Sequence, residues 1–171
     1  MIWMRIIVQN GGFVWEEVLP AEEAVREAFE EICGHLRAHW RVWGPGGAGE
    51  AAWEFRCPDP GKACPGGFSV RVEPAEAPST CRMYVLAADP EDPNGPAELW
   101  AVLTDVPTGI PPEEVEAQVR KAAGRIEGLP DPELFVARVT PRRPLDANPD
   151  DPEVYRVSWE AVQEAARDAP A

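Results

Sequence analysis

The sequence predicts an α+β fold with a mostly antiparallel sheet of about five to six strands, two main helices and a short C-terminal helix packed on it. Two observations lead to this prediction. Apolar residues alternate with polar ones in several short runs, as in half-buried strands, and recur at three- and four-residue spacing in longer segments, as in amphipathic helices. Most strand-like runs follow one another with short connections, which favours antiparallel pairing. The length of 171 residues fits a single domain that covers residues 1–171.

The N-terminal residues predict a β-hairpin. Residues 2–8 are almost continuously apolar, which indicates a strand buried on both faces. The pair that follows, Asn10 and Gly11, is the strongest short hairpin signal in the chain. We therefore expect residues 13–19 to form the returning strand.

A long amphipathic helix is predicted over residues 20–43. Pro20 suits its first turn, and the glycine-rich residues 44–47 end it. Its apolar side chains form one stripe, which we expect to pack on the sheet. The stripe consists of Val25, Phe29, Ile32, Leu36, Trp40 and Trp43.

Two alternating runs, residues 51–57 and 68–73, predict a second antiparallel hairpin with a long loop between its strands. Its expected register places Glu54 opposite Arg71, which is a favourable cross-strand pair.

The remaining residues predict two more strands, at residues 82–88 and 98–106, with a turn-rich loop between them. A second helix is expected over residues 111–127 and a last strand over residues 133–140. Ser158 is expected to cap the short C-terminal helix. The apolar face of the second helix consists of Val115, Val119, Ala122 and Ile126.

The charge balance excludes some classes of function. The chain has 30 acidic and 16 basic residues and a net charge of −14. Binding to nucleic acid and docking on anionic lipid both require a basic surface, so we expect no direct nucleic-acid binding and no membrane contact. No apolar run reaches the length of a membrane span.

Residues 1–8 are apolar but lack the basic segment and the cleavage site of a signal peptide. We therefore expect a cytoplasmic protein, in which cysteines are normally free thiols, metal ligands or catalytic groups. Lysine is rare, asparagine and glutamine are sparse, and proline is plentiful. This composition is compatible with a thermophilic source, and such organisms do keep disulfides inside the cell.

Two histidines, His35 and His39, lie four residues apart on the predicted first helix. This spacing can place both imidazoles on one metal ion. Helical geometry puts Cys33 roughly 160° around the axis from His35, which disfavours it as a third ligand. Cys57 and Cys64 are spaced more widely than the cysteines of the usual zinc knuckle. The histidines are therefore weak metal candidates, and we expect no cofactor.

Cys57 and Cys64 bracket the loop of the second predicted hairpin. A disulfide between them would stabilise the fold by about 2 kcal/mol, because it restricts the unfolded chain. Free thiols fit the sequence equally well. In either state we expect the two residues to be near neighbours. Neither cysteine follows a helix start or a cluster of basic residues that would activate a thiolate.

Other templates for chemistry fail on order or on missing residues. The glycine-rich residues 44–49 follow a helix and precede a strand, whereas a phosphate-binding loop needs the reverse order. Residues 146–157 resemble a calcium loop but lack its central glycine and its final glutamate. No serine-nucleophile elbow or kinase signature occurs. The catalytic residues of any enzyme activity are therefore unknown.

Acidic residues are distributed unevenly along the chain. The segment from Met83 to Val119 contains no lysine or arginine. A second acidic group lies on the expected outer face of the first helix. Because charge of one sign speeds association with an oppositely charged surface, we expect these residues to bind a partner. They are Asp89, Glu91, Asp92, Glu113, Glu114, Glu116, Glu23, Glu27 and Glu30.

These features favour an acidic protein-interaction module that performs no chemistry. It would bind a basic macromolecular surface, as an inhibitor, an immunity-type protein or a nucleic-acid mimic does. The seven tryptophans agree with this interpretation, because tryptophan anchors many interfaces. Two alternatives stay open. One is a small enzyme with a carboxylate- or histidine-based site, and the other is a metal- or redox-linked structural protein that uses the cysteines.

Overall fold

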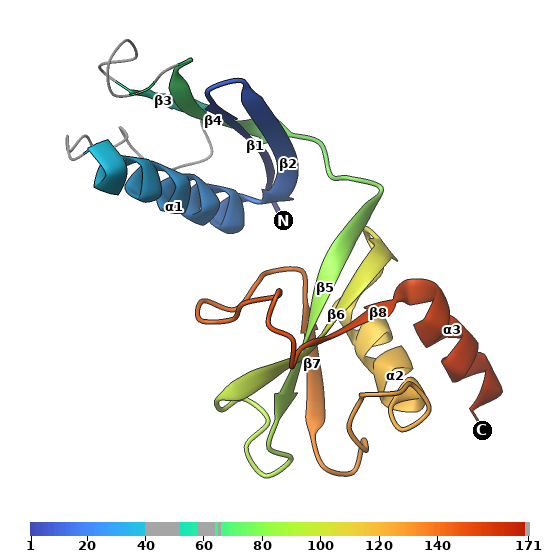
Figure 1. Cartoon of the computed structure of the whole chain (residues 1–171). Coiled ribbons are helices and arrows are strands. Elements are labelled where there is room, and N and C mark those ends of the chain that lie inside the picture. The colour runs from blue at the N-terminus through green and yellow to red at the C-terminus, as the bar shows by residue number, and fades with distance from the viewer. Residues whose placement is uncertain (40–51, 58–63, 65, 170–171) are drawn as a thin grey trace. The chain divides into compact units, whose positions relative to one another are not determined.

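The computed structural model describes residues 1–39, 52–57, 64 and 66–169 and has an α+β fold (Figure 1). Within these residues it contains eight strands, in two sheets of four, and three helices. The predicted α+β class is thereby confirmed. The expectation of one larger sheet is wrong, because the strands divide between two separate sheets.

The chain divides into two compact units, Met1–Pro78 and Ser79–Ala171. Each unit has its own sheet and its own cluster of buried apolar side chains. The expectation that residues 1–171 form a single domain stays a prediction.

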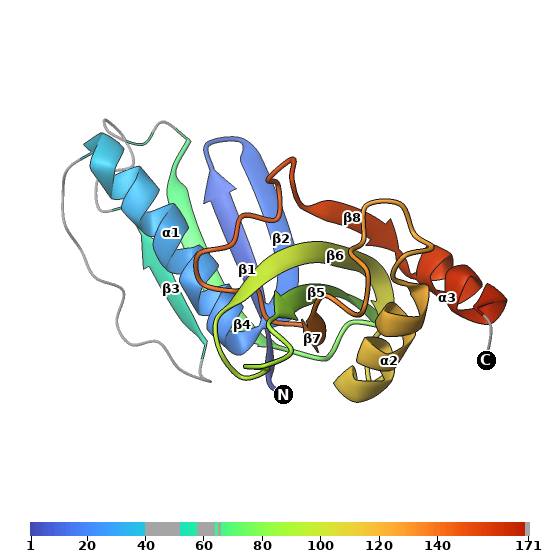
Figure 2. The same ribbon diagram turned by 90° about the horizontal axis from the view of Figure 1, so that it is seen from below.

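The sheet of the first unit is antiparallel throughout and has the order β2-β1-β4-β3. Its strands are β1 (Trp3–Asn10), β2 (Phe13–Pro20), β3 (Trp53–Arg56) and β4 (Phe68–Ala75). Met4, Ile6 and Val8 of β1 are buried on the face that the first helix covers (Figure 2). On the other face Trp3 is buried, whereas Arg5 and Ile7 are half-buried, so the prediction that both faces of β1 are buried holds only in part.

The predicted N-terminal hairpin is confirmed, with its turn shifted by one residue. β1 and β2 pair Asn10 with Phe13, so the two turn residues are Gly11 and Gly12. Gly11 has a φ of 62°, in the left-handed region that favours glycine and suits tight hairpin turns.

Helix α1 (Ala21–His39) packs on this sheet through a face that shares Ile32 with the expected stripe but is rotated toward Ala24 and Ala28. Ala24, Ala28 and Ile32 are fully buried, whereas Phe29 is 36% exposed. The short alanine side chains let the helix approach the sheet closely, and the bulkier Phe29 lies beside the contact. The members of the expected stripe that fall outside the described side chains are Leu36, Trp40 and Trp43.

The hairpin of β3 and β4 has the predicted register. Glu54 lies opposite Arg71, and the neighbouring Phe55 lies opposite Val70. The inward side chains of β4 are buried, as expected for a strand with one face on the core. They are Phe68, Val70 and Val72.

The second unit contains a mixed sheet with the order β7-β5-β6-β8. Its strands are β5 (Thr80–Ala88), β6 (Ala97–Pro107), β7 (Val136–Thr140) and β8 (Tyr155–Ser158). β5 pairs antiparallel with β6 and β7, while β8 runs parallel to β6. The sequence patterns predict β5, β6 and β7 but not β8.

Helices α2 (Pro112–Ala122) and α3 (Trp159–Asp168) pack against each other and against this sheet (Figure 1). The predicted cap is confirmed, because Ser158 accepts a hydrogen bond from the N–H of Ala161 at 3.2 Å. α2 is shorter than predicted, since Gly124 has a φ of 85° just after it. Its buried residues are Val115, Val119 and Ala122. None of the described helices has the length and apolar character that crossing a membrane requires.

Candidate functional site

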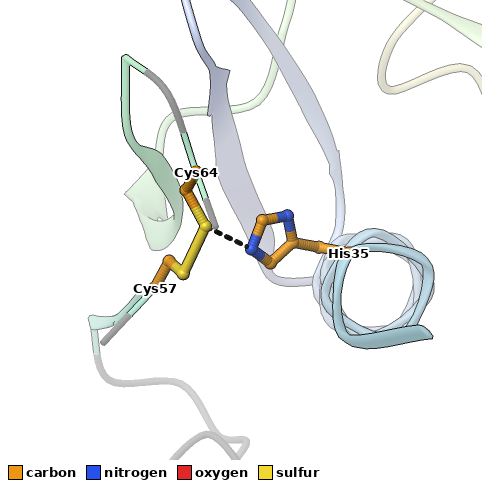
Figure 3. A group of neighbouring side chains, drawn as sticks. All are labelled: His35, Cys57 and Cys64. Atoms are coloured by element: carbon orange, nitrogen blue, oxygen red, sulfur yellow. Dashed lines mark hydrogen bonds between the residues drawn. A yellow bond between two sulfur atoms is a disulfide. The ribbon is translucent and has the colours of Figure 1, made fainter. Parts of the chain in front are cut away.

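Three side chains with metal-binding and redox chemistry lie together in the first unit: His35, Cys57 and Cys64 (Figure 3). One imidazole nitrogen and the two sulfurs all lie within 4.8 Å of one another. His35 belongs to the last turns of α1, whereas the cysteines lie between β3 and β4. We call these three residues the His–Cys cluster. The cluster lies where the C-terminal part of α1 meets the connection between β3 and β4.

Backbone hydrogen bonds and glycines fix the positions of the two cysteines. The N–H of Cys57 donates to the carbonyl of Phe68 at 3.0 Å, and the N–H of Gly67 donates to the carbonyl of Cys64 at 2.8 Å. Gly66 and Gly67 have φ values of 82° and 83°, which residues with a side chain rarely adopt. This tight turn brings Cys64 beside Cys57 at the start of β4.

Cys57 and Cys64 are joined by a disulfide, with Cα atoms 7.0 Å apart (Figure 3). This separation lies just beyond the usual range of about 4.4–6.8 Å for disulfides. Both residues are buried, with exposed fractions of 8% and 4%. The structure therefore places them as near neighbours, and their oxidation in solution stays a prediction.

The imidazole of His35 faces Cys64 in a fixed orientation. Its Nε2 lies 3.0 Å from the sulfur of Cys64, within hydrogen-bonding distance. The ring stacks on Phe68, with centroids 3.8 Å apart and planes within 1° of parallel. Phe68 in turn meets the ring of Phe55 edge to face at 6.2 Å. These contacts hold the imidazole so that Nε2 points at the sulfur.

An imidazole at this distance changes the chemistry of the sulfur. When the disulfide is open, the nitrogen can accept the thiol proton, and the imidazolium stabilises the thiolate that forms. The thiolate is both the nucleophile in disulfide exchange and the ligand in metal binding. Sequence reasoning finds no activating group near Cys64, because His35 is 29 residues away along the chain.

The structure revises the set of candidate metal ligands. Cys33 is exposed and lies outside the cluster, as helical geometry predicts. Cys57 and Cys64, which their spacing disfavours, both converge on His35. The side chain of His39 lies outside the described residues.

Two features of the sequence point to this convergence. His35 follows the buried Ile32 by three residues, so the two share a face of α1. Cys57 follows the buried Phe55 by two residues, so it continues the inward face of β3. Both side chains therefore point into the space between helix and sheet. The spacing of histidines and cysteines along the chain does not show this convergence. Spacing rules identify ligands that lie close together in the sequence, whereas these ligands come from two elements that face each other.

A groove of about 380 Å³ lies on the other face of the first sheet and reaches Cys57. It is lined by outward-facing side chains, among them Ile7 and the charged residues Glu54, Arg56 and Arg71. Arg56 pairs with Glu54 across 3.0 Å. Cys57 is among the residues that line the groove, although its side chain continues the inward face of β3, and Cys64 is the cysteine beside His35.

The acidic residues between Met83 and Val119 do not form one continuous group. Asp89, Glu91 and Asp92 are exposed in the loop before β6, whereas Glu113 and Glu114 are exposed in the first turn of α2, after β6. The 11 residues of β6 separate the two groups, at about 3.3 Å for each residue of a strand.

The other acidic candidates differ in their exposure. Glu116 is half-buried and forms an ion pair within α2 at 3.8 Å. Glu23 is only 5% exposed and lies 3.7 Å from Arg26, so its placement on the outer face of the helix is wrong. Glu27 is half-buried, and Glu30 is exposed.

Comparison with known proteins finds no family model that matches the chain, and no curated protein or solved structure that matches it.

Proposed function

We propose that this chain is a redox-linked structural protein in which Cys57 and Cys64 interchange between a disulfide and two thiols. The observation that supports it is the contact of 3.0 Å between Nε2 of His35 and the sulfur of Cys64, in a pair joined by a disulfide. A disulfide that only braces a fold needs no ionisable group beside it. An imidazole there favours exchange, because it stabilises the departing thiolate.

Opening begins when the thiolate of a low-molecular-weight thiol attacks the sulfur of Cys57. A sulfur–sulfur bond forms to Cys57, the Cys57–Cys64 bond breaks, and Cys64 leaves as a thiolate beside His35. A second low-molecular-weight thiolate then attacks the low-molecular-weight sulfur of this mixed disulfide. This step releases the Cys57 thiolate and a low-molecular-weight disulfide. Two electrons enter the protein, and closure is the reverse reaction with that disulfide as the oxidant.

Closure stabilises the first unit. Cys57 and Cys64 are 7 residues apart, and a cross-link over a loop of this size contributes on the order of 2 kcal/mol. The bond ties the end of β3 to the start of β4 on the side that faces α1. The redox state of the surroundings therefore sets the stability of this end of the hairpin.

Thiol counting at defined ratios of reduced to oxidised glutathione tests the proposal. We expect two free thiols under oxidising conditions, from Cys33 and Cys81, and all four cysteines free under reducing conditions. His35→Ala should slow the opening by a fixed thiol concentration roughly tenfold, because the leaving thiolate loses its stabilising partner. Four free thiols at every ratio would exclude this function.

A second function, binding to a basic macromolecular surface, is supported by the loop between β5 and β6. Asp89, Glu91 and Asp92 are exposed there, and none of them forms an ion pair with another residue that the structure describes. Carboxylates without an internal ion pair attract a basic surface, and salt screens that attraction.

Association kinetics with a basic partner captured at low salt test this second function. Reversing the three loop carboxylates to lysine should slow association more than it speeds dissociation. The double reversal Glu113→Lys and Glu114→Lys is the matched comparison at the other end of β6. Binding that ignores salt, or a best partner that is neutral or acidic, would exclude the function.

A further inference from the structure

We infer that the opened His–Cys cluster is a metal site, which binds one zinc ion through His35 and the thiolates of Cys57 and Cys64. The inference rests on the proposed function, because these sulfurs bind a metal only while the disulfide is open. The same three residues then have two states. The oxidised state contains the disulfide, and the reduced state holds Zn²⁺.

The three ligand atoms already lie near the positions that one ion requires. Zn²⁺ is bound tetrahedrally, with bonds of about 2.3 Å to sulfur and about 2.0 Å to nitrogen, so its ligand atoms are roughly 3.5–3.8 Å apart. The three atoms of the cluster lie within 4.8 Å of one another, and Nε2 of His35 is 3.0 Å from the sulfur of Cys64. Once the disulfide opens, the sulfurs can separate, and rotation of the side chains gives the tetrahedral spacing.

The chemistry of the ligands selects zinc among the common divalent ions. Two thiolates and an imidazole suit Zn²⁺, whereas Mg²⁺ and Ca²⁺ are bound by oxygen. No carboxylate belongs to this cluster within the described residues. Three protein ligands leave the fourth tetrahedral position for a water molecule or another group.

Burial favours the metal once the cysteines are reduced. Cys57 and Cys64 are 8% and 4% exposed, and two negative thiolates at such positions require positive charge nearby. One Zn²⁺ ion neutralises both. The stack of His35 on Phe68 holds Nε2 toward the sulfurs, so the imidazole is oriented before the metal arrives.

Zinc binding and oxidation use the same two sulfurs and exclude each other. Binding releases two protons, because each thiol becomes a thiolate. A low-molecular-weight disulfide that oxidises the loaded site takes two electrons from the thiolates and two protons from solvent, and becomes two thiols. The Cys57–Cys64 bond forms, and Zn²⁺ leaves the site. The redox state thus decides whether the protein holds zinc.

Metal titration of the reduced full-length chain tests the inference. The protein is reduced with a non-thiol reductant, freed of metal, and titrated with Zn²⁺ in competition with a chromophoric chelator. We expect one Zn²⁺ per chain. Co²⁺ in its place should show the charge-transfer absorption of a thiolate–metal bond. The oxidised chain should show neither.

Single substitutions identify the ligands. Cys57→Ser and Cys64→Ser should each weaken the charge-transfer absorption and the binding of Zn²⁺. His35→Ala should lower the zinc affinity by more than the roughly 10–100-fold that loss of a supporting residue causes. Cys33→Ser is the matched control, because Cys33 is a cysteine of the same helix outside the cluster, and it should bind zinc like the unchanged protein.

The outcomes separate this inference from the redox function. A reduced chain that binds no Zn²⁺, or whose Co²⁺ form lacks the thiolate absorption, overturns the metal site even if thiol counting shows that the cysteines interchange. Unchanged zinc affinity in His35→Ala does the same. A chain that binds Zn²⁺ but keeps four free thiols at every glutathione ratio overturns the redox function alone. If a variant fails to fold, the charge-transfer absorption of the Co²⁺ form of the unchanged protein still tests whether the metal site exists.

Discussion

At the scale of the residue, Phe68 contributes to the first unit in two ways. It is buried in the core, where its ring meets Phe55 edge to face, and it carries the stacked imidazole of His35. Any apolar side chain of similar volume can fill the core position, whereas the stack needs a flat ring. A leucine at this position separates the two roles.

Phe68→Leu should lower the free energy of unfolding by about 1 kcal/mol and should also weaken zinc binding by the reduced chain. The second effect is expected because the imidazole loses the surface that orients it. Phe55→Leu is the control, since Phe55 contacts Phe68. Urea unfolding and chelator competition measure the two effects. Equal zinc affinities in the two variants would show that the stack does not position His35.

The exposed fraction of Phe29, 36%, predicts a smaller loss of stability than a core position would give. Phe29→Ala should cost about 1 kcal/mol, whereas Ile32→Ala, at a fully buried position of the same helix, should cost about 3 kcal/mol. Urea unfolding of both variants measures the difference. A larger loss for Phe29 than for Ile32 would show that Phe29 lies within the buried contact, as the sequence alone predicts.

Burial raises the pKa of the Cys81 thiol, and the hydroxyl of Thr108 opposes part of that rise. The folded chain therefore holds this proton more tightly than the unfolded chain. The stability that Cys81 contributes is present below the ordinary pKa of a thiol and is lost as the pH rises through the raised pKa.

Alkylation of Cys81 as a function of pH measures this shift. We expect its midpoint to lie above that of the same cysteine in the unfolded chain, and Thr108→Val should move it higher, because the opposing hydroxyl is removed. A midpoint for Cys81 below that of the unfolded chain would contradict the burial argument.

At the scale of the element, the turn that precedes β4 determines where Cys64 lies. Gly66 combines a φ of 82° with close packing, since a Cβ there would lie 2.9 Å from the Cα of Gly11. Gly67 has a φ of 83° but open space around it, and Gly12 has open space and no positive φ. Alanine substitutions at these three glycines therefore distinguish the cost of backbone strain from the cost of steric overlap.

Gly66→Ala should destabilise the protein most, because it adds steric overlap with backbone to the strain of about 1–2 kcal/mol that a positive φ imposes on a side chain. Gly67→Ala should show the strain alone, and Gly12→Ala should cost the least. Unfolding of oxidised protein in urea gives the three values. Equal losses for Gly66 and Gly67 would show that the contact with Gly11 relaxes without cost.

The sequence predicts elements well where one local pattern dominates. The alternation around Phe55 gives the register of β3 and β4, and Ser158 marks the start of α3. The sequence does not predict β8. Val157 is the only buried residue among the four of this strand, so the strand shows no alternation of apolar and polar residues. The sequence also misplaces the face of α1, because a stripe of large side chains outweighs the small Ala28, which packs closer.

The His–Cys cluster shows the same limit at the candidate site. The residue types were visible in the sequence, but their convergence depends on how α1 lies across the sheet. That packing is a tertiary property, set by the apolar contacts of the whole unit. Local spacing rules for metal ligands do not contain it.

At the scale of the whole molecule, the chain consists of two units with separate cores. The cysteines divide unequally between them. Cys33, Cys57 and Cys64 belong to Met1–Pro78, and Cys81 is the one cysteine of Ser79–Ala171. The redox and metal chemistry proposed above therefore belongs to the first unit, and the second unit should be insensitive to both.

Separate expression of residues 1–78 and residues 79–171 tests this division. Each fragment should unfold cooperatively, because each keeps a complete sheet, with α1 in the first fragment and α2 and α3 in the second. Reductant should lower the stability of the first fragment by about 2 kcal/mol, as the disulfide opens, and Zn²⁺ should restore part of it. The second fragment serves as the control, because it contains a single cysteine and should respond to neither. Fragments that fold only when mixed would instead support the single domain predicted over the full length, since each core would then depend on the other.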